Sequence, residues 1–303
     1  MDLGVGQLSW QGVTFTPTVT WIRHFSMRAA QPVHGKVPTA LLRDDSWEAL
    51  VEQLSTISQV TIGSTAPGQL RQLVDAARLG IRVPRTVVLS NPGNWHEPPW
   101  TGSFIAKVMD RHYIEGEPGH ISWFHPRRVS SKKWAEFTST QPTDIPYILQ
   151  EYVAHRAEIR LYLIGKEFFS FSVKKTDPSD IWLAPGQVSV DAVTNPPPGV
   201  LEAARLLADT WGLRYGAFDL LIDDDGPVFL EVNAHGDWRW YEQRANVDAV
   251  SRLASRFTAL LHRSTRPDPS RFDLLTFLGA RTGFRPLQSH QASTLHSRRA
   301  QLS

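Results

Sequence analysis

A run of apolar and acidic residues near position 225 constrains the fold of this chain more than any other feature. Two short apolar segments, 217–222 and 227–232, flank an Asp-rich turn that ends in Gly226. Branched and aromatic residues on both sides of an Asp-Gly break are typical of two antiparallel strands joined by a tight turn. We therefore predict a β-hairpin, which fixes which side chains share one face of the sheet.

Three polar side chains interrupt these apolar segments. Glu231 and Asn233 are two residues apart, so they point to the same face of the second strand. Pairing of the hairpin is expected to bring Asp219 beside them. Two carboxylates and an amide oxygen suit Mg²⁺, which takes one or two carboxylates and completes its shell with phosphate oxygens and water. The alternative is a half-exposed hairpin whose charged residues only face solvent.

Composition predicts a globular protein of two or three lobes. The chain has 303 residues, of which 41% are hydrophobic and 10% aromatic, enough for a packed core. No long uncharged apolar window and no basic start followed by an apolar block is present, so we expect neither a membrane span nor a secretory signal. Cysteine is absent, which excludes disulfides and thiol nucleophiles and is compatible with the cytoplasmic location that we expect.

The net charge of +2 comes from the C-terminal tail. Residues 264–303 contain six Arg and two Asp, which contribute +4, so the rest of the chain carries −2. A nearly neutral body argues against nucleic acid as a partner. We expect the tail to be flexible or weakly docked.

The spacing of apolar residues predicts a mixed α/β order of elements. Helices are expected over 47–57, 67–79, 132–138, 199–212 and 248–263. Strands are expected over 14–22, 59–62, 81–89, 103–109, 121–124, 146–153, 158–164 and 167–173. Loops are expected over 110–120 and 176–199. A Pro-, Gly- and Asn-containing break at 91–99 predicts an N-terminal lobe over 1–95, a larger domain over 96–263 and a tail over 264–303.

A second set of polar residues lies upstream of the hairpin. Lys107 lies on a predicted strand before a Gly-containing loop, where its ammonium can reach a phosphate. The backbone near Glu151 can present amide and carbonyl groups to a base. Glu158 and Arg160 share one face of a strand, so a carboxylate for ribose hydroxyls stands beside a fork-shaped cation. Cations around a metal site are what phosphoryl transfer requires.

Each of these residues also has a purely structural interpretation. Lys107 can be a solvated lysine, and Arg160 can be a salt-bridge partner. Lys174 and Lys175 can belong to a solvent-facing surface. The acidic run 223–225 is expected to be a turn, because it lacks the ligand spacing of an EF-hand. The joint order of the polar set, rather than any one member, favours the functional interpretation.

In order and spacing, these residues resemble the ATP-grasp superfamily. The matching segments are 104–107, 150–153, 158–165, 218–220 and 229–233. Within that superfamily, segments 20–24 and 231–242 resemble the graspetide-type ligases that modify ribosomally made precursor peptides. The resemblance implies an ATP-grasp fold of mixed α/β (α+β) class, with a short N-terminal α/β lobe followed by central and C-terminal lobes.

The resemblance implies a ligase that depends on ATP and Mg²⁺. ATP would phosphorylate a carboxylate, and an amine or hydroxyl would then displace phosphate to give an amide or an ester. The expected partner is a precursor peptide or a small carboxylate and amine, and a second copy of the chain is a further candidate partner. The implied ATP-binding residues are Lys107, Gln150, Glu151, Tyr152, Val153 and Glu158; the catalytic residues are Arg160 and Lys174; the metal ligands are Asp219, Glu231 and Asn233.

The chain departs from this pattern in two places. Gln69 stands where many relatives carry a phosphate-binding lysine, with Arg71 as the nearest cation, and the N-terminal lobe is short. A small-substrate ligase of the amino-acid type and a non-catalytic nucleotide or peptide binder therefore remain alternatives. Trp238 and Trp240 are expected to pack in the core, with a peptide-facing wall as their second interpretation.

Overall fold

The computed structural model describes residues 2–4, 7–10, 13–15, 17–23, 38–56, 58–63, 66–90, 97–109, 113–117, 120–123, 125–140, 145–177, 180 and 184–265. Its helices are α2 (Pro38–Thr56), α3 (Gln69–Arg78), α4 (Trp134–Thr140), α6 (Val200–Trp211), α7 (Arg239–Ala245) and α8 (Ala249–Thr265), with single helical turns at Ser131–Lys133 and Pro185–Gln187. Its strands are β1 (Asp2–Gly4), β2 (Gln7–Trp10), β3 (Val13–Phe15), β4 (Val19–Trp21), β5 (Val60–Ile62), β6 (Thr86–Leu89), β7 (Ser103–Val108), β8 (Tyr113–Glu117), β9 (His120–Trp123), β10 (Arg127–Ser130), β11 (Tyr147–Glu151), β12 (Ala157–Ile164), β13 (Glu167–Lys174), β14 (Ser189–Val193), β15 (Tyr215–Asp223) and β16 (Gly226–Asn233).

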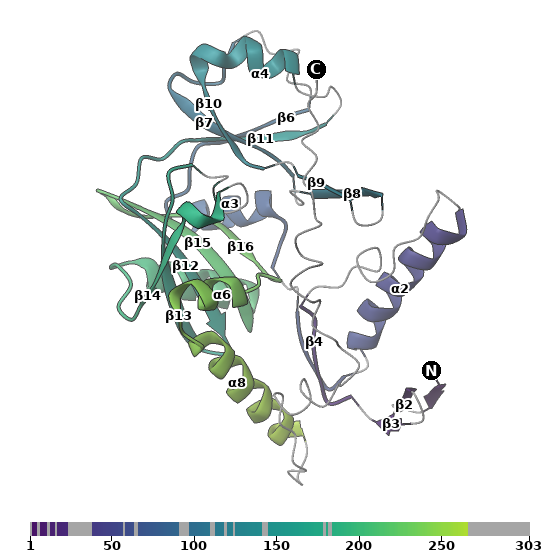
Figure 1. Ribbon diagram of the computed structural model, residues 1–303. Coiled ribbons are helices and arrows are strands. Elements are labelled where there is room, and N and C mark those ends of the chain that lie inside the picture. The colour runs from purple at the N-terminus through teal and green to yellow at the C-terminus, as the bar shows by residue number, and fades with distance from the viewer. Residues whose placement is uncertain are drawn as a thin grey trace.

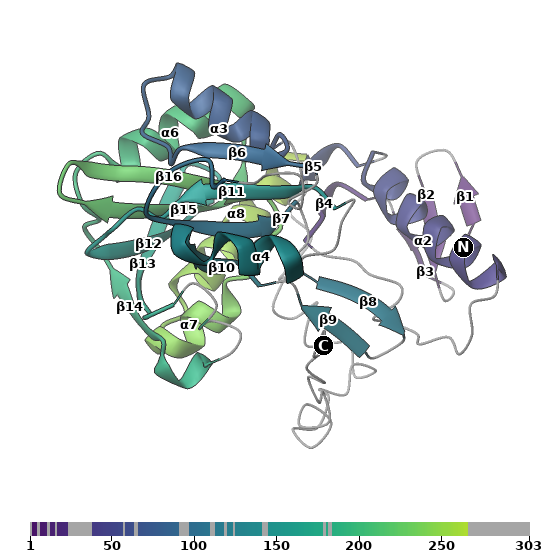
Figure 2. The same ribbon diagram turned by 90° about the horizontal axis from the view of Figure 1, so that it is seen from above.

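Five antiparallel strands form the sheet of the C-terminal lobe, in the order β14-β13-β12-β15-β16. Helices α3 and α6 lie on the same side of this sheet (Figure 2). The contacts between them are apolar, since Ile159 and Leu161 of β12 and Leu207 of α6 are each at most 2% exposed. The predicted hairpin is present as β15 and β16, so that prediction is confirmed.

The opposite face of this sheet is apolar at one end of its strands and charged at the other. At one end, Tyr162 and Ile164 of β12 and Tyr215 of β15 pack with residues of α8 and β4 in a second core cluster. Toward the other end, Arg160 and Glu158 continue the same face of β12 at two-residue spacing. One sheet face therefore joins a hydrophobic anchor to a row of charged side chains.

A second antiparallel sheet, in the order β10-β7-β11-β6, lies above the first in Figure 1. Helix α4 covers its outer face, where Phe104, Trp134 and Leu149 belong to a separate core cluster. Because side chains alternate along a strand, Ile105 and Lys107 of β7 project from the inner face. Strand β6 pairs with β11, so this part of the predicted N-terminal lobe completes the central sheet.

The N-terminal residues add a smaller unit to the same structure. Strands β4 and β5 pair in parallel, and Val19, Trp21 and Ile62 pack in the core cluster that contains α8 residues. Helix α2 begins earlier than the helix predicted from residue 47, and β1, β2 and β3 form a small antiparallel sheet. None of the helices in the described ranges has both the length and the hydropathy that crossing a membrane requires.

Two predictions of local structure were wrong, and one helix was not predicted. Strand β8 lies in the segment predicted as loop 110–120, β14 lies in the predicted loop 176–199, and α7 was not predicted. Strands β8 and β14 pair with β9 and β13 respectively, so pairing overrides a weak local signal. Residues 91–96 of the predicted break and 266–303 of the predicted tail lie outside the described residues.

An ion pair closes the turn between β15 and β16. Asp223 pairs with Gly226 across two intervening residues, and Gly226 has a φ of 115°, which favours glycine. The guanidinium of Arg82 donates to both Asp223 oxygens at 2.7 Å each, and the Asp225 N–H donates at 2.9 Å. The hydrogen bond from Arg82 is the main cause that lowers the pKa of Asp223 to about 2. The acidic run is a turn, as predicted.

We predict that Arg82→Met raises the pKa of Asp223 toward its ordinary value of 3.8. A carboxyl group whose pKa is lower in the folded chain than in the unfolded chain stabilises the fold. This contribution is complete above the unfolded-state pKa and is lost as the pH falls through the folded-state pKa. The stabilisation is therefore complete above about pH 4 and disappears as the pH falls toward about 2. Carboxyl NMR titration measures the pKa, and urea unfolding across this pH range measures the loss of stability.

Arg156→Met is the matched control for this experiment. Arg156 pairs at 3.6 Å with Asp224 in the same turn, and the Asp224 side chain is fully exposed. Exposed pairs of this kind contribute little, so Arg156→Met should leave the stability profile close to that of the wild type. An Asp223 pKa that stays low in Arg82→Met would contradict the assignment.

Candidate functional site

A cavity of about 330 Å³ lies between the inner face of the central sheet and the charged end of the C-terminal sheet. Its size is at the lower end of the range for ligand pockets. The lining includes these predicted site residues: Lys107, Gln150, Glu151, Tyr152, Val153, Glu158, Arg160, Asp219, Glu231 and Asn233. The fold thus brings together residues that are up to 126 positions apart in the sequence, and Lys174 is the predicted residue that it leaves out.

The acidic corner of the cavity is built by β15 and β16. Asp219 lies directly opposite Glu231, whereas the next pair is Leu220 with Phe229, so Leu230 is an additional residue on β16. Such a β-bulge re-aims side chains and is frequent beside functional sites. Leu230 and Glu231 both line the cavity although they are consecutive. The bulge therefore places an apolar wall next to the carboxylate.

The donor set of this corner fits a magnesium ion. No group of three His, Asp or Glu side chains suited to a metal occurs among the described residues, and the corner instead offers two carboxylates and the amide of Asn233. Burial is the largest influence on Asp219 and raises its pKa to about 6, with the nearby Glu231 adding to the rise and Arg160 opposing it. A buried carboxylate with a raised pKa beside a second carboxylate is an arrangement that a divalent cation stabilises.

Cations approach this corner from both sheets. Arg160 of β12 donates a hydrogen bond to the Asp219 carboxylate. The Lys107 Nζ of β7 lies 3.4 Å from Glu231 Oε2, and the Lys107 side chain is only 7% exposed. Gln69 of α3 donates to the same Glu231 oxygen. Gln69 is therefore part of the site, although its amide carries no charge.

The lysine next to Glu158 is Lys175 rather than the predicted Lys174. Lys175 Nζ donates to Glu158 Oε1 at 2.8 Å, and both side chains are at least 86% buried. Lys174 is exposed and pairs with Asp191 at 3.7 Å. The pairing of Glu158 with Val173 explains the difference, because Lys175 is two residues after Val173 and directly follows the end of β13, on the same side. Counting this register from the Gly-Lys turn would have found it in the sequence.

The other end of the cavity is lined by the segment 150–153. The amides of Glu151 and Tyr152 donate to carbonyls of Arg85 and Ser103 at 2.9 and 3.0 Å. Val153 lines the cavity, and among the described residues its amide has no backbone acceptor. Of the three amides of residues 151–153, that of Val153 is therefore the candidate donor to a ligand.

Apolar side chains and the side-chain amide of Gln150 also line this end of the cavity. Ile105 and Leu221 line the cavity from the two sheets. Gln150 is 4% exposed, and its Nε2 donates to Thr86 at 3.2 Å, so its side chain is held in one orientation. The guanidinium of Arg128 lies 3.6 Å from the centre of the Tyr152 ring. Apolar side chains beside a backbone donor and an amide suit the binding of a base.

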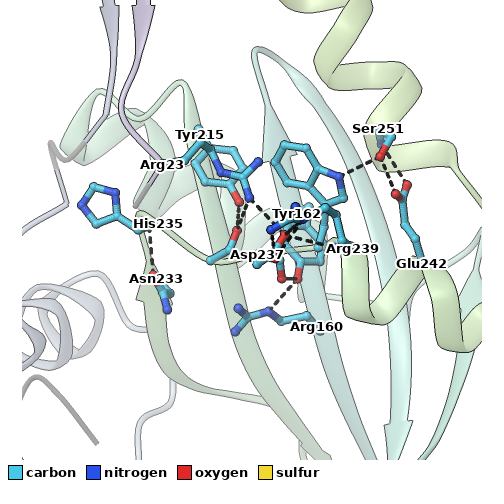
Figure 3. A network of polar contacts seen from close by, with 12 residues as sticks. Arg23, Arg160, Tyr162, Tyr215, Asn233, His235, Asp237, Arg239, Glu242 and Ser251 are labelled. Carbon is cyan, nitrogen blue, oxygen red and sulfur yellow. Dashed lines mark hydrogen bonds and ion pairs between the residues drawn. The ribbon is translucent and has the colours of Figure 1, made fainter. Parts of the chain in front are cut away.

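The loop that follows Asn233 is fixed by side chains from three parts of the fold (Figure 3). Arg23 donates to the Gly236 carbonyl at 3.4 Å and to the Asp237 carboxylate at 3.3 Å. The Tyr162 hydroxyl donates to the Asp237 carbonyl at 2.7 Å, and the Tyr215 hydroxyl donates to the Gly236 carbonyl. These contacts set the path of the chain directly after the candidate metal ligand.

The two segments that carry the finer family resemblance meet at this loop. The Arg23 guanidinium lies 3.6 Å from the centre of the Trp238 ring, and Trp21 packs edge-on against Tyr215 at 5.1 Å between ring centres. Trp238 is 7% exposed, so its predicted core role is confirmed. Residue 24 of the first segment lies outside the described residues.

The second segment also caps the last helix. Glu242 is 6% exposed and accepts hydrogen bonds from the N–H and the hydroxyl of Ser251 at 2.8 and 2.5 Å. Trp238 Nε1 donates to the same hydroxyl at 2.9 Å. The first N–H groups of a helix need such acceptors. Glu242 therefore anchors α8 rather than lining the cavity (Figure 3).

Tyr241 is a cavity residue that the sequence did not indicate. Its ring lies 5.3 Å from the Arg160 guanidinium, and burial raises the pKa of its hydroxyl. It belongs to helix α7, which was not predicted, so no helical periodicity in the sequence indicated that Tyr241 faces the cavity.

Solved structures share this fold, whereas no protein-family profile and no curated protein sequence matches the chain. The macrocyclase MdnC from Microcystis aeruginosa MRC, bound with its precursor peptide MdnA, aligns with a TM-score of 0.67 and 18% identity over 87% of this chain and 86% of MdnC. The ATP-grasp ligase PsnB, complexed with a minimal precursor, Mg and ADP, aligns with a TM-score of 0.60 and 19% identity over 82% of this chain and 80% of PsnB.

A third similar structure is the RiPP-associated ATP-grasp ligase of Chryseobacterium gregarium, in complex with ADP and a leader and core peptide. It aligns with a TM-score of 0.59 and 18% identity over 88% of this chain and 86% of that chain. Together these alignments establish that the chain has the ATP-grasp fold, and they confirm the fold that the sequence predicted.

We predict that Gly236→Ala is strongly destabilising. A Cβ at residue 236 would lie 2.6 Å from the Ala217 Cβ and 2.7 Å from a terminal nitrogen of Arg160. Both neighbours are buried, so relief of the clash must displace the loop or the guanidinium. We expect the free energy of unfolding, measured in urea, to fall by about 1–3 kcal/mol.

Gly186→Ala is the control, because no atom lies within 4 Å of its added Cβ and its φ is not positive. Its free energy of unfolding should stay within about 0.5 kcal/mol of the wild type. Equal stability of the two variants would refute the close packing of Gly236 against Arg160.

Proposed function

We propose that this ATP-grasp chain is an ATP- and Mg²⁺-dependent ligase that forms an ester or amide bond on a peptide. The observation that carries the proposal is the acidic corner of the cavity, where Asp219 and Glu231 are each in contact with a buried cation. In the proposed reaction, a substrate carboxylate takes the terminal phosphoryl group of ATP and ADP leaves. An amine or hydroxyl then attacks the acyl carbon, and phosphate and a proton are released.

The cavity residues divide into groups with different tasks. Asp219, Glu231 and Asn233 would hold the magnesium ion, which would supply charge neutralisation at the phosphate oxygens. Lys107 and Arg160 stand on opposite sides of the carboxylates, so their charges can orient an anionic chain of phosphates between the two sheets.

The nucleoside end of the cavity would bind through neutral contacts. The Val153 amide is the candidate donor to the base, and the Gln150 side chain is held by Thr86 in a fixed orientation. Glu158 would accept hydrogen bonds from ribose hydroxyls, with Lys175 keeping its carboxylate in place. ATP would thus lie along the inner faces of both sheets.

A peptide is the class of substrate that the comparisons favour. MdnC, PsnB and the Chryseobacterium ligase were each solved with a precursor or a leader and core peptide. The segments at Arg23 and Trp238, which resemble those of peptide-modifying ligases, build the loop after Asn233. A small carboxylate and amine remain the alternative substrate class.

A non-catalytic nucleotide binder is the second candidate function. The observation in its favour is Gln69, a neutral side chain that donates to the Glu231 carboxylate in place of a further cation. Fewer positive charges around the phosphates would weaken stabilisation of the reaction without preventing nucleotide binding.

An assay of ADP release separates these functions. We predict ADP formation from ATP and Mg²⁺ only when an Asp- or Glu-containing precursor peptide, taken from the reading frames next to this gene, is added. Turnover with free amino acids alone would support the small-substrate alternative. Binding of ATP without ADP formation under either condition would support the non-catalytic binder.

We predict that Glu231→Ala lowers ADP formation by about a hundredfold or more, because it removes a metal ligand and the contact of Lys107. Urea unfolding checks that the variant remains folded, which is expected because Glu231 lies outside the core clusters. Glu202→Ala, on the exposed side of α6, is the control and should retain full turnover. Unchanged turnover in Glu231→Ala would refute the metal assignment.

A further inference from the structure

Gln72 of α3 makes an unusual set of contacts with the strand that carries the acidic corner. Its side chain is 5% exposed. Its Oε1 accepts from the Val232 N–H at 2.8 Å, and its Nε2 donates to the Val232 carbonyl at 3.1 Å. The same Nε2 donates to the Pro67 carbonyl at 2.8 Å. Both amide protons and the amide oxygen of Gln72 are thus in use.

This geometry makes the Gln72 amide a substitute for a neighbouring strand. Strand β16 is the edge of its sheet, so its outward N–H and carbonyl groups have no strand to pair with. A side-chain amide offers the same donor and acceptor as a peptide group and can satisfy both. Three residues earlier, the Phe229 N–H donates to the Arg82 carbonyl at 2.8 Å. The outer edge of β16 is therefore held on both sides of the bulge at Leu230.

Val232 lies between the two candidate metal ligands of β16. Its own side chain packs in the core cluster beneath α3 and α6, so Glu231 and Asn233 on either side of it face the cavity. Fixing the backbone of Val232 therefore fixes the origin of both ligand side chains. Gln69, one helical turn before Gln72, contacts the Glu231 carboxylate itself.

We infer that Gln72 is a positioning residue for the metal corner, an inference that rests on the proposed function. Gln72 holds the peptide groups around Val232 in the conformation that directs Glu231 and Asn233 toward one cation. Helix α3 thereby connects the N-terminal residues to the divalent ion and sets its affinity, without any contact between Gln72 and the ion.

Asp75, on the same helix, provides a matched control. Its side chain is 11% exposed, accepts from Trp211 Nε1 at 3.1 Å and lies 2.7 Å from Arg71 Nε. These contacts join α3 to α6 rather than to β16. A substitution at Asp75 therefore weakens the packing of the helix while leaving the backbone of Val232 supported.

The test compares Gln72→Met with Asp75→Asn in the full-length chain. Binding of Mn²⁺, as a paramagnetic replacement for Mg²⁺, is measured by EPR titration in the presence of saturating ADP, so no turnover is needed. We expect the dissociation constant for Mn²⁺ to rise about tenfold in Gln72→Met, because two backbone hydrogen bonds beside the ligands are lost. Hydrogen exchange at the Val232 amide should accelerate in the same variant.

Asp75→Asn should lower the midpoint of thermal unfolding. It should leave the Mn²⁺ dissociation constant within about twofold of the wild-type value, because the hydrogen bonds of Asp75 run to α3 and α6 rather than to β16 and distant sites act independently. Gln72→Glu keeps the size of the side chain and the acceptor for Val232 N–H but loses both donors, so it should weaken Mn²⁺ binding while remaining folded. This variant keeps the test decisive if Gln72→Met does not fold.

Two results would overturn the inference, and they are distinguishable. Wild-type Mn²⁺ affinity in folded Gln72→Met and Gln72→Glu would show that Gln72 does not position the ligands, with the proposed function untouched. Absence of Mn²⁺ binding in the wild type with ADP present would remove the metal site, and with it the proposed function.

Discussion

The register of three neighbouring strands is the constraint on which the site depends. Arg160, Asp219 and Glu231 lie in one row across β12, β15 and β16. A slip of one residue would turn every side chain of a strand to the other face. Tight connections limit such a slip: Gly165 and Lys166 join β12 to β13, and a two-residue acidic turn joins β15 to β16. The row also depends on the long-range pairing of β12 with β15 and on the bulge at Leu230, which brings Glu231 opposite Asp219.

Each carboxylate of this row is in contact with a cation. Arg160 contacts Asp219, and Lys107 reaches Glu231 from the opposite sheet. A buried carboxylate without a partner costs several kcal/mol, whereas a nearby cation favours its charged form. Both carboxylates are oriented by contacts that the fold already supplies.

The hairpin and its acidic turn could be predicted from sequence because they follow from local rules of strand and turn composition, although the register counted from the turn alone would pair Asp219 with Leu230 rather than with Glu231. The bulge at Leu230 and the contact of Gln72 with Val232 could not. That contact joins residues 160 positions apart. A single side-chain amide that hydrogen-bonds the backbone of an edge strand produces no periodic pattern in the sequence. Lys175, rather than Lys174, contacts Glu158 because Glu158 pairs with Val173 and the next residue on that side is Lys175. Strands β8 and β14 were missed because pairing, more than composition, creates them.

The N-terminal residues support the end of β16 at two separate points. Gln72 holds Val232, and Arg23 holds the carbonyl of Gly236 beyond Asn233. Each contact joins residues at least 160 positions apart, so neither can form within the C-terminal sheet alone. The Arg23 contact also brings the described residues of segment 20–24 to the loop within segment 231–242.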